Sequence, residues 1–221
     1  MTDYQHIIVD SPLEGVSRIT LNRPDSRNAL NNVLRGEIYG TLEANDNDDA
    51  IRVTIIRGAG KAFCAGYDLK GNSDEDRPFH TAGGDGSWAR HVVEGAFRVW
   101  DLAKPVIAQV HGYCLAGGTE LATSCDLVYV AEDAKIGYPV VRSMSPPDNQ
   151  FFPWVVGMRN AMEMMLTGDA ISGTDAASYG FANRAFPVDD LEAEVMKVAA
   201  KIAKIPTDIE QMNKRAVDRQ M

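Results

Sequence analysis

Residues 105–126 constrain the fold and the chemistry of this chain more than any other segment. The apolar run at residues 106–110 predicts a buried strand, and the pair Gly117 and Gly118 then leads into a helix-like stretch. Glycine backbone lets a substrate carbonyl approach closely, and free N–H groups at a helix start stabilise developing negative charge. Glu120 follows Gly117 by three residues, so one helical turn can direct its carboxylate to the same place. The segment therefore predicts an oxyanion site with a carboxylate beside it.

A second glycine-bearing turn, at residues 61–70, has a comparable place in the sequence. It also follows an apolar strand, and it carries Gly66 where the other turn carries Gly117. If the two strand ends meet on one side of the core, the amides after Gly66 and near Gly117 could hold one carbonyl oxygen from two directions. Glycine turns also serve as packing devices between strands and helices, so the pattern alone leaves both interpretations open.

The composition excludes several classes of function. A formal net charge of -9 argues against binding to nucleic acid or to an anionic membrane, because both need a basic face. No apolar run reaches the length of a bilayer span, and the first residues lack the plan of a secretory signal. We therefore expect a cytoplasmic protein that does not insert into membranes.

The cysteines and histidines do not indicate a disulfide framework or a metal site. Cys64, Cys114 and Cys125 form no CxxC pair and leave one thiol over from any disulfide, so we interpret them as reduced and buried. The histidines lack the spacing of metal ligands. His111, Ser124 and Asp126 have the residue types of a hydrolytic triad, but no Gly-x-Ser-x-Gly elbow surrounds the serine, so we interpret them as structural.

Strand-like and helix-like patterns alternate along the chain, which favours an α/β architecture with helices covering a sheet. No internal repeat or low-complexity linker is present. We expect one catalytic core at residues 1–190 and a C-terminal helical segment at residues 191–221. Strands are predicted at residues 16–21, 51–57, 106–110 and 127–131, helices at 29–44, 87–102 and 190–203, and a long loop at 71–86.

Several short blocks carry a resemblance to a known family. They are Leu21-Asn-Arg-Pro with Asn28-Ala-Leu30, Ala62-Phe-Cys-Ala-Gly-Tyr-Asp-Leu69, Lys104-Pro-Val-Ile-Ala, His111-Gly-Tyr, Gly117-Gly-Thr-Glu-Leu121, Cys125-Asp126 and Leu166-Thr-Gly-Asp-Ala-Ile-Ser172. Together, and in this order, they resemble the crotonase superfamily, the enoyl-CoA hydratase/isomerase group. The blocks extend over nearly the whole chain.

The resemblance implies a spiral of repeated ββα units that assembles as a homotrimer or a dimer of trimers. It implies a lyase or isomerase of fatty acid metabolism whose substrate is an acyl-CoA thioester. Coenzyme A would enter as part of that substrate, with no permanently bound cofactor and no metal. Members of the family usually continue through further helices after the segment at 191–221, so we expect this trimerisation region to be shortened or incomplete.

The resemblance also assigns roles to individual residues. It implies that the thioester oxygen accepts hydrogen bonds from the backbone N–H groups of Tyr67 and Gly117, and that Glu120 acts as general acid and base. The residues matched to substrate and coenzyme A binding are Ala29, Ala65, Gly66, Asp68 and Leu69.

One position departs from the pattern of the hydratases. Their second catalytic glutamate corresponds here to Val140, which cannot transfer a proton. Asp148 lies eight residues further on and matches a position where some hydrolases of the family place a catalytic aspartate, although an Asp after prolines also initiates turns. The leading hypothesis is enoyl-CoA hydration or isomerisation through Glu120. The alternatives are a CoA-thioester hydrolase using Asp148 and a non-catalytic acyl-CoA binder.

Overall fold

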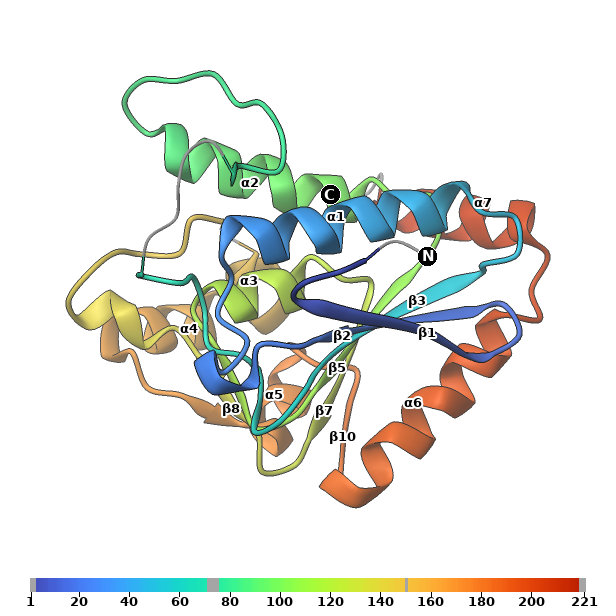
Figure 1. Ribbon diagram of the computed structural model, residues 1–221. Helices are drawn as coiled ribbons and strands as arrows, with labels where there is room; N and C mark the ends of the chain where they lie inside the picture. The colour runs from blue at the N-terminus through green and yellow to red at the C-terminus, as the bar shows by residue number, and fades with distance from the viewer. Residues whose placement is uncertain (1–2, 71–75, 150, 219–221) are drawn as a thin grey trace.

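The computed structural model describes residues 3–70, 76–149 and 151–218. Two β-sheets form its framework, and helices pack around them (Figure 1). The larger sheet has the strand order β1-β2-β3-β5-β7-β10, and the smaller one has the order β4-β6-β8-β9. The mixed α/β class predicted from the sequence is confirmed.

The strands have the following bounds. The larger sheet contains β1 (Ile7–Leu13), β2 (Val16–Leu21), β3 (Val53–Gly58), β5 (Val106–Val110), β7 (Leu127–Ala131) and β10 (Arg184–Phe186). The smaller sheet contains β4 (Ala62–Cys64), β6 (Tyr113–Leu115), β8 (Lys135–Gly137) and β9 (Ile171–Ser172).

The central strands of the larger sheet run parallel and are covered on both faces. Ile19 pairs with Ile56, Ile56 with Ala108, and Ala108 with Val128, and all four residues are buried. Strands covered on both faces are expected to be largely apolar, and β5 has four apolar residues beside the buried Gln109. In Figure 1, α1 and α2 lie on one side of this sheet and α6 on the other.

The described helices include those predicted at residues 29–44, 87–102 and 190–203, which are α1, α2 and α6, and others for which no bounds were predicted. The described helices are α1 (Asn32–Asn47), α2 (Ser87–Trp100), α3 (Gly117–Thr123), α4 (Phe152–Thr167), α5 (Gly173–Tyr179), α6 (Val188–Ile202) and α7 (Thr207–Asp218), with short 3-10 turns at Pro24–Ser26 and Pro139–Arg142. The helix predicted from residue 29 starts at residue 32, because the Asn31 side chain caps it by accepting a hydrogen bond from the Leu34 N–H at 2.8 Å. Gly157, at φ 75° and ψ 157°, interrupts α4.

Two predicted segments extend beyond the described residues. Part of the loop predicted at 71–86 and the end of the C-terminal helical segment lie outside them. The helix α6 spans the predicted domain boundary at residue 190 and packs Leu191, Val195 and Ala199 into the core. The division into a core and a trimerisation segment stays a prediction. No helix in the described ranges combines the length and the apolar character needed to cross a membrane.

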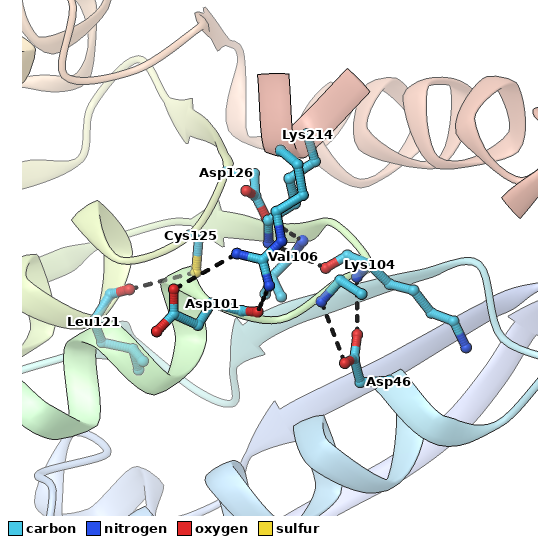
Figure 2. Close-up of polar contacts among 10 residues, drawn as sticks. Asp46, Asp101, Lys104, Val106, Leu121, Cys125, Asp126 and Lys214 are labelled. Carbon is cyan, nitrogen blue, oxygen red and sulfur yellow. Dashed lines mark hydrogen bonds and ion pairs between the residues drawn. The ribbon is translucent and has the colours of Figure 1, made fainter. Parts of the chain in front are cut away.

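The last helix, α7, returns to the start of β5 and is held there by polar contacts (Figure 2). The Lys214 ammonium lies 3.0 Å from the Asp126 carboxylate, which also accepts a hydrogen bond of 2.7 Å from the Val106 N–H. The guanidinium of the next residue, Arg215, donates to the Asp101 carbonyl at 2.7 Å. These contacts fix α7 against the segments that precede β5 and β7.

Candidate active site

The two glycine-bearing turns lie next to each other at one edge of the smaller sheet. They follow β4 and β6, which are parallel neighbours, and not the longer strands β3 and β5 that the sequence suggested. The backbone at Gly66 has φ 108°, and a Cβ placed there would lie 2.8 Å from the Ala116 Cβ and 3.3 Å from the Gly117 nitrogen. Only glycine allows the two turns to approach this closely.

Both candidate oxyanion donors are free of backbone partners. Leu30 donates to the Gly66 carbonyl at 2.8 Å and Asp68 donates to the Leu30 carbonyl at 3.0 Å, so the intervening Tyr67 N–H points away from that segment. Gly117 is the first residue of α3, where no intrahelical acceptor exists. Among the described residues, neither Tyr67 nor Gly117 donates a backbone hydrogen bond.

Glu120 lies in the first turn of α3 and is only 2% exposed. Its Oε2 accepts a hydrogen bond from the Tyr67 hydroxyl at 2.7 Å. Its Oε1 accepts from the Tyr138 hydroxyl at 3.0 Å and from the Asp148 N–H at 2.8 Å. Burial raises the pKa of this carboxyl above its ordinary value, although the hydrogen bonds from the two phenols work in the opposite direction.

Asp148 brings a second carboxyl to the same site. It is half-buried, and its Oδ2 accepts a hydrogen bond from the Trp88 indole N–H at 3.2 Å. Burial raises the pKa of Asp148, and the charge of Asp148 helps to raise that of Glu120. Val140 lies in the 3-10 turn after β8 and packs against the hydrophobic core.

The Tyr67 side chain covers Gly117. A Cβ on Gly117 would lie 2.6 Å from the Tyr67 Cε2, so the ring rests directly on that glycine. The ring also meets Trp88 edge to face, at 5.1 Å between centroids. The cavity that Tyr67 and Gly117 line with Glu120, Arg35 and Asn149 has a volume of about 20 Å³. This volume has room for about one water molecule.

The residues matched to coenzyme A binding gather along one path beside the site. The Ala65 N–H donates to the Arg27 carbonyl at 3.0 Å, which places the segment of Ala29 alongside that of Ala65 and Gly66. The Arg23 guanidinium joins the two segments, because it binds the Ala29 carbonyl and lies 2.8 Å from the Asp68 carboxylate. Leu69 is 74% exposed at the outer end of this path.

Sequence reasoning missed the side chains that surround the two carboxyls. Tyr138, Trp88, Arg35 and Asn149 each carry a polar group at the site, yet none lies within a recognisable motif. Tyr138 follows β8 and directly precedes Pro139 and Val140. An isolated tyrosine before a proline was therefore the only feature of the sequence that could have indicated its role.

The remaining candidates have structural contacts of their own. The His111 ring lies 2.9 Å from the Gly60 carbonyl, and Ser124 donates to the Glu120 carbonyl at 2.7 Å, while Asp126 binds Lys214. These three side chains therefore bind different partners. Cys64, Cys114 and Cys125 are unpaired and buried. In the described part of the chain, no group of three His, Cys, Asp or Glu side chains could hold a metal ion.

Comparison with known proteins identifies the family. The sequence model of the enoyl-CoA hydratase/isomerase family matches residues 12–221. The chain belongs to this family. It is 34% identical to the mitochondrial enoyl-CoA hydratase of Pongo abelii over 206 residues, which cover 92% of this chain and 69% of that protein.

Solved structures of the enoyl-CoA hydratase/isomerase family have the same fold. An enoyl-CoA hydratase/isomerase from Xanthobacter autotrophicus Py2 superimposes with a TM-score of 0.88 at 38% identity, over 99% of this chain and 80% of that one. An enoyl-CoA hydratase from Mycobacterium smegmatis gives a TM-score of 0.88 at 31% identity, over 99% and 78% of the two chains. The crotonase-like fold expected from the sequence blocks is thereby confirmed.

Proposed function

We propose that this protein hydrates or isomerises an enoyl-CoA thioester. The thioester oxygen accepts hydrogen bonds from the N–H groups of Tyr67 and Gly117, and Glu120 transfers the proton. One observation carries the proposal: a buried carboxylate lies beside two adjacent backbone N–H groups that have no partner among the described residues.

The proposed chemistry needs both features. Adding water to a conjugated thioester, or moving its double bond, passes through an enolate whose charge collects on the thioester oxygen. Two fixed donors stabilise that charge, and losing one such donor typically costs about 2.7–4 kcal/mol of transition-state stabilisation. Burial raises the pKa of Glu120, which makes the carboxylate a stronger base than an exposed glutamate.

Asp148 supports a second candidate function. Its carboxyl adjoins Glu120, is half-buried and has a raised pKa, so it can accept a proton from a water molecule beside the thioester. In a hydratase, Asp148 would replace the second catalytic carboxyl, because the residue at the usual position, Val140, has none. In a hydrolase, it would direct water to the thioester carbon and release free coenzyme A.

One assay separates these functions. Purified protein is incubated with crotonyl-CoA and longer enoyl-CoAs, while the conjugated thioester and free thiol are followed together. Hydration removes the conjugated signal without producing thiol, and hydrolysis produces thiol. If neither signal changes while the protein still retains CoA ligands, it is a binder and the proposed catalysis is wrong.

We also propose a cytoplasmic homotrimer or dimer of trimers that takes coenzyme A only as part of its substrate. Three unpaired cysteines agree with a reducing compartment. The second part of α4 exposes apolar side chains one turn apart, Met158, Met162 and Leu166, at 63%, 49% and 77%. Such a stripe on a surface helix is typical of a contact between subunits.

A further inference from the structure

Arg35 is a buried cation next to the proposed active site. It lies on α1, is only 2% exposed, and donates one hydrogen bond, from Nη1 to the Asn32 side chain at 3.2 Å. Its Nε and Nη2 have no hydrogen-bond partner within the described ranges. The guanidinium lies over the rings of Trp88 and Tyr67, at 5.4 and 5.9 Å from the centroids. These rings hold the cation in place but do not pair its remaining N–H groups.

Asn149 has the same unusual combination of burial and free polar atoms. It is 4% exposed, and neither its Oδ1 nor its Nδ2 has a partner among the described residues. Buried polar groups normally find partners, because an unpaired one loses its hydration without compensation. Arg35 and Asn149 line the same cavity as Gly117 and Glu120. Both residues therefore adjoin the space beside Glu120 with polar atoms that are buried and unpaired.

We propose that Arg35 and Asn149 bind a carboxylate at the far end of the acyl group, so that the substrate is a CoA thioester of a dicarboxylic acid. This inference rests on the proposed function. A guanidinium with two free nitrogens matches the two oxygens of a carboxylate, and the Asn149 amide adds a further donor. Glu120 and Asp148 would repel a second anion in this site, and the charge of Arg35 offsets that repulsion.

A carboxylate reaches Arg35 only when the Tyr67 ring moves, because the cavity has room for about one water molecule. The Tyr67 and Trp88 rings contact Arg35 on one side, and their polar atoms donate hydrogen bonds to the carboxylates of Glu120 and Asp148 on the other. A chain that displaces the Tyr67 ring from Gly117 opens a path along the cavity wall toward Arg35. A neutral chain arriving there leaves the free N–H groups unpaired, whereas a carboxylate pairs them.

The test compares two saturated ligands of equal length that the enzyme cannot hydrate. Dissociation constants of glutaryl-CoA and pentanoyl-CoA, both with five acyl carbons, are measured by titration calorimetry. We expect the wild-type protein to bind glutaryl-CoA at least about tenfold more tightly, the size of one charge-assisted hydrogen bond. Arg35→Met should abolish this preference, and Asn149→Leu should reduce it. Arg90→Met, which removes an exposed cation from α2, should preserve it.

Binding and turnover are read separately. Retained pentanoyl-CoA binding by the Arg35→Met variant shows that its pocket is folded, and Arg35→Lys provides a second variant if that protein does not fold. Equal or tighter binding of pentanoyl-CoA by the wild type, or an unchanged preference in the Arg35 and Asn149 variants, would overturn the inference. If the protein prefers glutaryl-CoA but turns over no enoyl-CoA, the carboxylate site is supported and the proposed catalysis is refuted.

Discussion

At the scale of single residues, burial and hydrogen bonding have opposite effects on the pKa of the Glu120 carboxyl. Burial favours its neutral form, while hydrogen bonds from Tyr67, Tyr138 and the Asp148 backbone favour the anion. Replacing Glu120 with Gln keeps the shape and removes the proton-transfer group. We expect turnover to fall by about 10²–10⁴-fold with little change in the unfolding temperature.

The matched control is Glu132→Gln, which changes an exposed glutamate outside the site. Steady-state rates with the substrate identified in the crotonyl-CoA assay give the comparison. Unchanged turnover in the Glu120→Gln protein would remove the assigned role.

The Tyr138 hydroxyl gives a prediction about pH. Glu120 must be ionised to act as a base, so kcat/KM should decline as the pH falls through its raised pKa, at a pH above the ordinary value of 4.5. Tyr138→Phe removes a hydrogen bond that lowers this pKa. We expect the acidic limb of the pH profile to move to higher pH.

The control for this profile is Tyr179→Phe, because Tyr179 is exposed and lies away from the carboxyls. An acidic limb that stays in place, or moves to lower pH, in the Tyr138→Phe protein contradicts the arrangement of hydrogen bonds described above.

Some of these residues were predictable from sequence and others were not. Gly117 and Glu120 lie three positions apart, so helical geometry alone relates them. Tyr138 and Arg35 reach the site from other elements, and their contacts depend on how the smaller sheet and α1 pack. Local periodicity contains no information about such distant contacts, which is why these two residues were missed.

At the scale of elements, the turn after β4 tolerates only glycine at position 66. Gly66→Ala forces an unfavourable φ of 108° on a residue with a side chain and presses its Cβ against Ala116. We expect a loss of about 1–3 kcal/mol in the free energy of unfolding, together with reduced kcat because the Gly117 amide shifts. Chemical denaturation and steady-state kinetics measure the two effects.

Gly83→Ala is the matched control, since a Cβ there meets nothing within 4 Å and φ is not positive. If Gly66→Ala were as stable and as active as this control, the close approach of the two turns could not be needed for catalysis.

The helix α7 contains a glutamate that makes stability depend on pH. Glu210 is 5% exposed, its carboxylate oxygens have no partner among the described residues, and burial raises its pKa to about 7. The charged groups that face it are Arg52, Lys104, Asp126 and Lys214. A carboxyl whose pKa is raised on folding stabilises the folded state below pH 4.5 and loses that contribution as pH rises through 7.

We therefore expect Glu210→Gln to stabilise the protein at pH 8 by roughly 1–3 kcal/mol, on a scale of about 1.4 kcal/mol for each pKa unit, and to have no effect near pH 4. Asp208→Asn, an exposed change on the same helix, should show no such gain. Urea denaturation at the two pH values measures the free energy of unfolding of each variant. A gain of equal size at both would mean that ionisation of Glu210 is not its cause.

At the scale of the whole molecule, alternating strand and helix patterns indicated the class of fold because β2, β5 and β7 of the larger sheet have five or six residues each and are mostly buried. The smaller sheet was not predictable in the same way. Its strands are two or three residues long, too short for any period to emerge. Their pairing is nevertheless what brings the two glycine turns together.

Assembly gives a prediction at the same scale. If the apolar stripe on α4 joins subunits, Leu166→Glu should place a charge in the contact and yield a particle of 24.1 kDa, the mass of one chain. Light scattering after size-exclusion chromatography measures the mass. Val188→Glu, an exposed apolar position on α6, should leave the assembly intact. A Leu166→Glu protein with the mass of the wild type would exclude this stripe as the contact.

The position of the Tyr67 ring has a consequence for selectivity by size. The ring rests on Gly117 and its hydroxyl binds Glu120, so we expect an acyl chain to displace the ring and break these interactions when it binds. A long acyl chain offsets that loss through its own apolar contacts, at about 0.8 kcal/mol for each buried methylene. Acetyl-CoA brings too few carbon atoms to do so. We therefore expect long acyl chains to bind more tightly than acetyl-CoA.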